Sequence, residues 1–338
     1  MQNPRMTSAE LSELGAELGL DVIGASPAEA YVDTERHIRE RRERGLFADM
    51  RFTMARPEVS CHPEKLFESA RSVVAAALCY ARDVPEPGPD EGRLPRYSWR
   101  DEYAELREKL DALGRRMGGS YRVLVDDNDH VDRAAAVRAG IAFYGKNTMA
   151  ITHRHGSWVV LGVLVTDVEV DTSPPLELDC GQCRLCIDAC PTGALDEPGT
   201  LDATRCLSYW SQAPAVIPEP FRAEMADMVY GCDICQDVCP WNRGVEKRRR
   251  GSPTPAVEPL VRLADWLESD PAELATEFDR LYVPRNDARW LRRNALVVAG
   301  NVGTDALRPT VERYTGSSDS MLAETATWAL ERMAERRA

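Results

Sequence analysis

The stretch Cys180-Gly-Gln-Cys183-Arg-Leu-Cys186-Ile-Asp-Ala-Cys190-Pro191 has the spacing C-x2-C-x2-C-x3-C-P. In bacterial [4Fe–4S] ligation with this spacing, three cysteines hold one cluster and the fourth ligates the other cluster. A later run, Cys232-Asp-Ile-Cys235-Gln-Asp-Val-Cys239-Pro240, contains only three cysteines, and Cys206 lies between the two runs. The pattern predicts that this part of the chain folds around two iron–sulfur clusters.

Counting ligands assigns every cysteine of this region. Two [4Fe–4S] clusters need eight thiolates, which is the number that the two runs and Cys206 supply together. The crossed arrangement predicts one set of Cys180, Cys183, Cys186 and Cys239, and a second set of Cys190, Cys206, Cys232 and Cys235. Zinc uses one or two CxxC pairs, and disulfide frameworks are typical of short secreted chains. Both alternatives therefore fit this spacing poorly.

The composition limits the remaining choices. With 338 residues, the chain is long enough for two or three domains. The first residues lack an apolar signal region, and no uncharged run is long enough to span a membrane. Clustered thiols without a signal sequence indicate a reducing cytoplasm. Of the two cysteines outside the region, Cys79 is expected to be a buried hydrophobe, and Cys61 is left undecided.

The charge distribution is uneven. A formal net charge of −13 argues against broad nonspecific binding of nucleic acid, because phosphate contacts need Lys and Arg. Two local basic clusters nevertheless favour an anionic macromolecular partner, with a solvated surface as the alternative. They are Lys247 to Arg250, and the set Arg285, Arg289, Arg292 and Arg293. His153 and His155 have no metal spacing and are expected to be exposed loop residues.

Hydrophobic periodicity predicts three domains. Strands alternating with helices over residues 1–170 indicate an α/β domain, residues 171–250 form the two-cluster domain, and 251–338 form helices. The expected helices before residue 170 are 7–19, 34–44, 101–117 and 133–139, the expected strands are 21–25, 69–80, 121–125 and 157–165, and 83–95 is expected to be a loop. The C-terminal helical patterns are 260–267, 272–278, 290–299 and 321–333, and stacked pairs of the HEAT type fit them.

Chemistry outside the cysteines centres on Asp126. No G-x-G-x-x-G or P-loop motif is present, so the first domain must carry another cofactor or bind a redox partner. Asp126 ends an apolar strand, where α/β sheets present ligands. Its acidic neighbours Asp127, Asp129 and Asp132 would raise the pKa of one member, as an acid donor requires. The alternative is an acidic surface turn. The loop 143–148 fits a cofactor loop and an ordinary turn equally well.

At this point the chain resembles the epoxyqueuosine reductase family. The resemblance rests on ordered blocks along nearly the whole chain, which are more specific than the cysteines alone. The blocks are Pro63 to Val74, Val125 to Lys146, Cys180 to Ala194, Asp202 to Tyr209, Tyr230 to Arg243, and Arg289 to Ala295.

The resemblance implies a fold and a set of cofactors. It implies an N-terminal α/β domain that binds base-off cobalamin, a ferredoxin-like domain with two [4Fe–4S] clusters, and C-terminal all-α HEAT-like helices. The clusters would feed electrons to cobalt, and Asp126 would donate a proton to the substrate. Cobalamin contacts are implied for Lys146, Asn147, Thr148, Ser208 and Tyr209.

The implied reaction is reductive opening of the epoxide of epoxyqueuosine at the wobble position of the tRNA anticodon, giving queuosine. Removing the epoxide oxygen as water takes two electrons and two protons, which suits clusters, reducible cobalt and a carboxylic acid. The resemblance also implies tRNA bound by basic side chains of the C-terminal helices, an external donor such as flavodoxin or ferredoxin, and a monomeric cytoplasmic enzyme with no membrane partner.

Three segments depart from the family pattern. An expected Arg-Asp-Tyr-His reads Arg100-Asp-Glu-Tyr-Ala104, a short Ser-Ala-Pro is replaced by Asp127-Asn-Asp129, and Glu-Arg-Pro reads Asp132-Arg-Ala134. These changes leave two alternatives open. One is a cobalamin and iron–sulfur reductase of a small molecule, and the other is a ferredoxin-like electron carrier without cobalamin.

Overall fold

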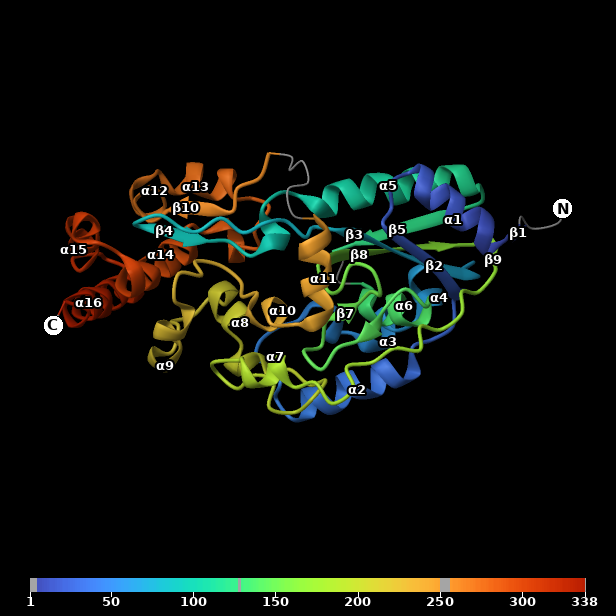
Figure 1. Ribbon diagram of the computed structural model, residues 1–338, viewed down its shortest axis with the longest axis horizontal. Helices are drawn as coiled ribbons and strands as arrows, with labels where there is room; N and C mark the ends of the chain where they lie inside the picture. The colour runs from blue at the N-terminus through green and yellow to red at the C-terminus, as the bar shows by residue number, and fades with distance from the viewer. Residues whose placement is uncertain (1–4, 127–128, 250–255, 338) are drawn as a thin grey trace.

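The computed structural model describes residues 5–126, 129–249 and 256–337 (Figure 1). Most strands lie in the N-terminal half of the chain, and short helices carry the cysteine region. The first half contains β1 (Arg5–Met6), α1 (Ser8–Glu17), β2 (Val22–Pro27), α2 (Val32–Glu43), α3 (Pro57–Ser60), α4 (Pro63–Leu66), β3 (Ser72–Cys79), β4 (Glu91–Arg93), α5 (Glu102–Met117), β5 (Tyr121–Val125), α6 (Asp132–Arg138), β6 (Phe143–Tyr144), β7 (Ala150–Ile151), β8 (Val159–Thr166) and β9 (Glu169–Val170).

In its described residues the second half contains one strand, and its other regular elements are helices (Figure 1). The cysteine region contains α7 (Leu185–Asp188), α8 (Leu207–Gln212), α9 (Glu219–Arg222), α10 (Ile234–Asp237) and α11 (Pro240–Arg249). The C-terminal region contains β10 (Leu260–Arg262), α12 (Leu263–Glu268), α13 (Pro271–Glu277), α14 (Arg289–Val302), α15 (Arg308–Tyr314) and α16 (Ser320–Glu335). None of the described helices is long and apolar enough to cross a membrane.

Local sequence signals explain several element boundaries. Thr7 and Glu10 form a capping box that starts α1, since each side chain accepts a hydrogen bond from the backbone N–H of the other. Asp101 caps α5 by accepting from the N–H of Ala104 at 2.8 Å. The strand predicted over 121–125 is β5, with the same bounds.

The main sheet has the order β2-β3-β8-β5, and every neighbouring pair in it is antiparallel. The ligand-edge rule applied to Asp126 belongs to parallel sheets, so it does not account for the position of this residue. Because β3 and β5 are both antiparallel to β8, they run in the same direction and end at the same edge of the sheet. Asp126, which follows β5, and Tyr80, which follows β3, therefore lie at one edge.

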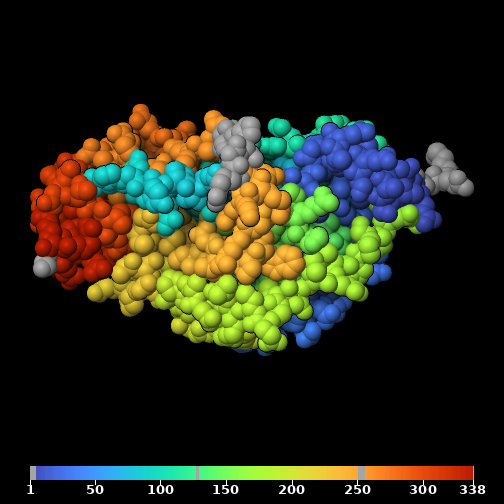
Figure 2. Space-filling view, viewed as in Figure 1, coloured from blue at the N-terminus to red at the C-terminus, as the bar shows by residue number. Residues whose placement is uncertain are grey.

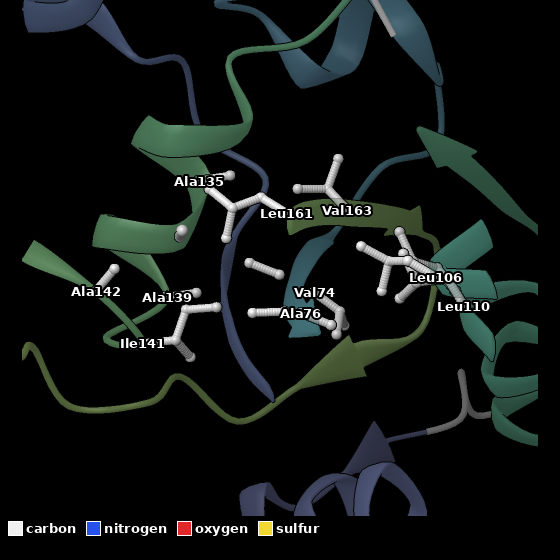
Figure 3. Packing of buried hydrophobic residues seen from close by; sticks show 14 of the residues in the cluster. Val74, Ala76, Leu106, Leu110, Ala135, Ala139, Ile141, Ala142, Leu161 and Val163 are labelled. Carbon is white, nitrogen blue, oxygen red and sulfur yellow. The ribbon is translucent and has the colours of Figure 1, made fainter. Parts of the chain in front are cut away.

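Helices cover both faces of this sheet. The helix α5 packs against β8 and β5 on one face, whereas α6 packs against β3, β8 and β2 on the other. Figure 3 shows Leu106 and Leu110 of α5 separated from Ala135 and Ala139 of α6 by the strands. Gly162 of β8 allows the close approach of α5, because a Cβ there would lie 2.8 Å from the Leu110 side chain. Cys79 is buried in β3, as expected, and Cys61 is also buried.

A second hydrophobic cluster joins distant parts of the chain. Leu94 and Trp99 pack with Tyr230 and with the C-terminal helices α12, α14 and α16. The prediction of a loop over 83–95 and a helix from residue 260 is wrong in part, since β4 and β10 form an antiparallel pair. Helix α15 was not predicted. In the space-filling view, α11 lies between the segment that carries β4 and the residues around α1 and the main sheet (Figure 2).

Candidate active site

Two groups of cysteines lie in the region between the sheet and the C-terminal helices. The first group lines a cavity of about 160 Å³, together with Lys146, Asn147, Ile151, Pro240 and Trp241. Its members are Cys180, Cys183, Cys186 and Cys239. The loop that carries it is largely exposed at Gly181, Gln182 and Arg184, so this group lies close to the surface.

The second group is more deeply placed. Burial, together with the neighbouring Cys206 and Cys190, raises the pKa of the Cys232 thiol to about 12. Burial also raises the pKa of the Cys235 thiol, and the neighbouring Cys232 and Cys206 raise it as well. The fold thus brings together the same two sets of four that ligand counting predicts. Among the described residues, no group of three or more His, Cys, Asp or Glu side chains is placed to hold a single metal ion.

Residues of the loop 143–148 hold the cysteine runs in place. The Nζ atom of Lys146 donates to the carbonyls of Gly181 at 2.6 Å and Cys183 at 2.9 Å. The Nδ2 atom of Asn147 donates to the carbonyl of Cys235 at 3.3 Å. One β-hairpin therefore contacts the loops of both cysteine groups. Thr148, with a φ of 66°, follows in the same turn.

Ser208 and Tyr209 lie on α8, directly after Cys206. The Tyr209 hydroxyl donates to Asp49 at 2.5 Å, and Ser208 accepts from Gln212. Together with Lys146, Asn147 and Thr148, these residues lie where the N-terminal region meets the cysteine region. Their contact with cobalamin stays a prediction.

A buried polar network joins the second cysteine run to the sheet edge. The Ser157 hydroxyl donates to Gln236 at 2.9 Å, and the Asn242 amide donates to Ser157 at 3.0 Å and to the Gln236 carbonyl at 2.8 Å. The Tyr80 hydroxyl, which follows β3, donates weakly to Gln236 at 3.4 Å. We did not predict these contacts from the sequence. The only available signal was the presence of Gln236 and Asn242 in the block from Tyr230 to Arg243.

Arg96 reinforces the same junction. Its guanidinium lies 4.0 Å from the centre of the Trp158 ring and pairs with Asp237 at 2.8 Å. Its backbone N–H donates to Asp233 at 2.9 Å. Burial nevertheless raises the pKa of Asp233 to about 6, so this carboxyl beside Cys232 holds a proton near neutral pH more readily than an exposed aspartate.

Asp126 lies at the sheet edge in an unusual conformation. Its φ of 49° is left-handed, which is uncommon for a residue other than glycine. The guanidinium of Arg107 donates to the carbonyl of Val125, the residue before it. The carboxyl is exposed and lies among tyrosines, because its charge raises the pKa of Tyr97, Tyr103 and Tyr230 in addition to the effect of their burial.

Asp132 is the acidic neighbour that the fold places near Asp126. Burial raises the pKa of Asp132, and the charge of Asp126 raises it further. Tyr144 lies near Asp132, whose charge adds to the raised pKa of the tyrosine. Asp129 instead pairs with Arg122 at 2.9 Å, and Asp127 lies outside the described residues. The charge of one carboxyl thus raises the pKa of the other, which favours a protonated acid at this end of the sheet.

The departures from the family pattern have local structural counterparts. The inserted Glu102 is buried and pairs with Arg82 at 2.6 Å, so the insertion provides an ion pair at the start of α5. Ala104 is exposed in the first turn of this helix. His130, which follows the departing segment 127–129, is only 1% exposed. It packs edge-to-face on Tyr31 with a centroid distance of 5.4 Å.

Burial of His130 predicts that stability falls at mildly acidic pH. Burial lowers its pKa from 6.5 to about 4, although a hydrogen bond with the backbone of Ser60 acts in the opposite direction. The unfolded chain therefore binds the proton first, and folding loses up to about 3 kcal/mol as pH falls from 6.5 towards 4. We expect urea unfolding to show this loss for wild type and a flatter pH dependence for His130→Phe. The facing groups Tyr31 and Cys61 have pKa values of about 12 and about 11, so they keep the same charge in this window. Equal pH profiles for the two proteins would contradict the prediction.

The two basic clusters contain both exposed and buried side chains. Arg293 is 0% exposed and donates to the carbonyls of Trp210, Ser211, Ala213 and Ala215, so its expected availability to a partner is wrong. Arg285 is exposed, and Arg289 pairs with Asp287 at 2.9 Å. In the other cluster Lys247 and Arg248 are exposed, and Arg250 lies outside the described residues. His153 is exposed as expected, but His155 is half-buried.

Comparison with known proteins agrees with this arrangement. Residues 61–127 match the family model "Epoxyqueuosine reductase QueG, DUF1730", and residues 179–242 match "4Fe-4S double cluster binding domain". Epoxyqueuosine reductase of Lactococcus garvieae is 31% identical over 340 residues, covering 96% of this chain and 95% of the relative. That of Bacillus subtilis is 32% identical over 341 residues, covering 96% and 87%.

Solved structures give the same result. Epoxyqueuosine reductase from Streptococcus thermophilus superposes with a TM-score of 0.87 at 29% identity, covering 97% of this chain and 90% of that one. A crystal structure of epoxyqueuosine reductase with an epoxyqueuosine-modified tRNA-Tyr stem loop superposes with a TM-score of 0.85 at 31% identity. It covers 96% of this chain and 89% of that one. The described fold is therefore similar along nearly the whole chain.

Proposed function

This chain belongs to the epoxyqueuosine reductase family, and we propose that it reduces epoxyqueuosine to queuosine at the wobble position of tRNA. The observation that carries the proposal is the similarity, over 96% of the chain, to a reductase whose structure holds an epoxyqueuosine-modified tRNA stem loop. The chain is accordingly an oxidoreductase that acts on a base in RNA.

The reaction breaks both C–O bonds of the epoxide, leaves an alkene and releases the oxygen as water, which takes two electrons and two protons. Cobalamin, when bound, supplies a reducible cobalt, and iron–sulfur clusters supply single electrons. The role of Asp126 is to donate a proton to the departing oxygen. Its position near Asp132 and near Tyr97, Tyr103 and Tyr230 supports this role, since a second carboxyl nearby favours the protonated form of one of the two.

The two cysteine groups are the proposed cluster ligands. Cys180, Cys183, Cys186 and Cys239 would hold the cluster near the surface, and Cys190, Cys206, Cys232 and Cys235 would hold the buried one. The thiol-only donor sets and the double-cluster family model support this assignment. An electron donor such as flavodoxin or ferredoxin would reach the surface group first.

Cobalamin is proposed to lie between the N-terminal α/β domain and the cluster domain, in contact with Lys146, Asn147, Thr148, Ser208 and Tyr209. The fit is supported by the position of these residues at the junction of the two regions, where Tyr209 contacts Asp49 and Lys146 contacts Cys183. In this layout, residues 1–170, 171–250 and 251–338 are the three domains, and the last contributes HEAT-like helices. A monomeric enzyme of the cytoplasm is part of the same proposal.

The proposal is tested by reconstituting the protein with iron, sulfide and cobalamin, then supplying a low-potential reductant and epoxyqueuosine-containing tRNA. Digestion and mass spectrometry of the nucleosides should show the loss of one oxygen that converts epoxyqueuosine to queuosine. An iron-loaded sample without cobalamin serves as the control. Absence of conversion by a preparation that holds both cofactors would overturn the proposal.

A further inference from the structure

Two large aromatic side chains are exposed where the N-terminal and C-terminal regions meet. Phe52 is 40% exposed and Tyr282 is 55% exposed, yet their rings touch edge-to-face with a centroid distance of 5.7 Å. Phe52 lies between α2 and α3, and Tyr282 lies between α13 and α14. Exposed aromatic rings offer large flat surfaces and lose little conformational freedom when a ligand binds. A pair of them in contact therefore indicates a binding function.

The backbone around both rings is held in uncommon conformations. Phe52 has a φ of 31°, and Arg285 and Asn286 have φ values of 59° and 51°. None of these residues is glycine, so the surrounding structure must maintain their left-handed geometry. Such conformations cluster at ligand-binding segments, where they fix the direction of a side chain.

Both segments are tied to the candidate active site. The Tyr230 hydroxyl donates to the carbonyl of Tyr282 at 2.9 Å, and Tyr230 is one of the tyrosines near Asp126. On the other side, Asp49 accepts from Tyr209 at 2.5 Å, and the carbonyl of Thr53 accepts from Ser60 at 2.7 Å. The aromatic pair is thus linked to both the proton-donor region and α8.

Positive charge flanks the rings. Arg51 precedes Phe52, Arg285 follows Tyr282 by one short turn, and both side chains are exposed. The whole chain has a net charge of −13, whereas the two arginines place positive charge beside the exposed aromatic rings. Aromatic rings that stack on bases, with arginines that contact phosphates, are the combination by which proteins bind single-stranded RNA.

We propose that Phe52 and Tyr282 form a stacking platform for a nucleobase of the tRNA anticodon loop that lies next to the modified base, with Arg51 and Arg285 contacting its phosphates. The inference rests on the proposed function, because an anticodon loop is its stated occupant. Holding a neighbouring base on this platform keeps the loop unstacked, so that the modified base reaches Asp126. The platform contributes to binding and positioning, and takes no part in the proton transfer.

The test measures binding of an epoxyqueuosine-containing anticodon stem loop by fluorescence anisotropy. We expect Phe52→Ala and Tyr282→Ala each to raise the Kd about 10-fold or more, as loss of one base–aromatic stack does. Phe52→Tyr and Tyr282→Phe keep the rings and should bind like wild type. Val32→Ala, which removes an exposed hydrophobic side chain at the start of α2, is the matched control and should also be neutral.

Two further readouts separate stacking from a structural role. The alanine variants should raise KM for the stem loop with kcat nearly unchanged, and keep the wild-type dependence of Kd on salt. Arg285→Ala should instead reduce the slope of log K against log salt by about 0.7, the value for one phosphate of single-stranded nucleic acid.

The outcomes also distinguish this inference from the proposed function. Wild-type protein that neither binds nor converts the modified stem loop would contradict both. If wild type binds and converts it while Phe52→Ala and Tyr282→Ala bind with unchanged Kd, only the stacking platform is overturned. A rise in Kd for Phe52→Tyr as large as that for Phe52→Ala would likewise overturn stacking, because the ring is retained.

Discussion

Replacing Cys206 by alanine is expected to halve the bound iron, from about eight atoms per chain to about four, and to abolish reduction of the substrate. Cys206 is the only ligand of the proposed buried cluster that lies outside the two cysteine runs. Its neighbours in the fold are Cys190 and Cys232, so its loss leaves three thiolates at that cluster. Iron analysis, the visible spectrum and a turnover assay on anaerobically reconstituted protein measure the effect.

The chain provides both a comparison and a control for this experiment. Cys180→Ala should also remove about half of the iron, because it affects the other set, and the double variant should hold almost none. Cys61→Ala removes a buried thiol outside both sets and should keep about eight irons. Full iron content in Cys206→Ala would contradict the crossed ligand sets and favour a different partner for the second cysteine run.

The crossed sets could be predicted because cysteine spacing is a local property of the chain. Two residues between cysteines determine which thiolates converge, whatever the rest of the fold does. The same is true of α1, whose start depends on Thr7 and Glu10, and of β5, whose run of apolar residues ends within five positions. In each case the forces that decide the structure act between residues close in sequence.

Pairing between distant segments could not be predicted in this way. The strand β4 pairs with β10 and also bridges from Arg93 to Met228, and neither β4 nor β10 has a strong strand pattern of its own. The antiparallel order of the main sheet has a similar origin, since alternating strands and helices do not fix strand direction. Asp126 still lies beside Tyr80, because β5 and β3 end at the same edge.

Arg293 shows why sequence reasoning misjudged one charged residue. In the sequence it belongs to a basic cluster, but in the fold its guanidinium donates to four carbonyls of the segment 210–215. Burial lowers its pKa to about 9, yet these carbonyls satisfy its donors. The partner groups are backbone atoms, which carry no sequence signal. Conversely, Phe52 and Tyr282 have no pattern in the sequence and become a pair only through tertiary contact.

The second large effect is expected at Asp126. Asp126→Asn removes the acidic proton, keeps nearly the same volume, and tolerates the left-handed φ of 49° because asparagine adopts that region readily. We expect kcat to fall about 100- to 10,000-fold, the usual contribution of a positioned general acid. Binding of the tRNA stem loop and the iron content should remain at wild-type values, which excludes misfolding as the cause.

Asp132→Asn is the matched variant, because Asp132 is the acidic neighbour of Asp126 and its own pKa is raised by burial and by the Asp126 charge. A donor is active while protonated, so activity should fall as pH rises through the pKa of the acid. Neutralising Asp132 removes a like charge and should lower the pKa of Asp126, which shifts this fall in activity to lower pH and leaves the maximal rate within about 10-fold. The opposite result, a large loss of kcat in Asp132→Asn with activity retained in Asp126→Asn, would make Asp132 the donor, since burial already favours its protonated form.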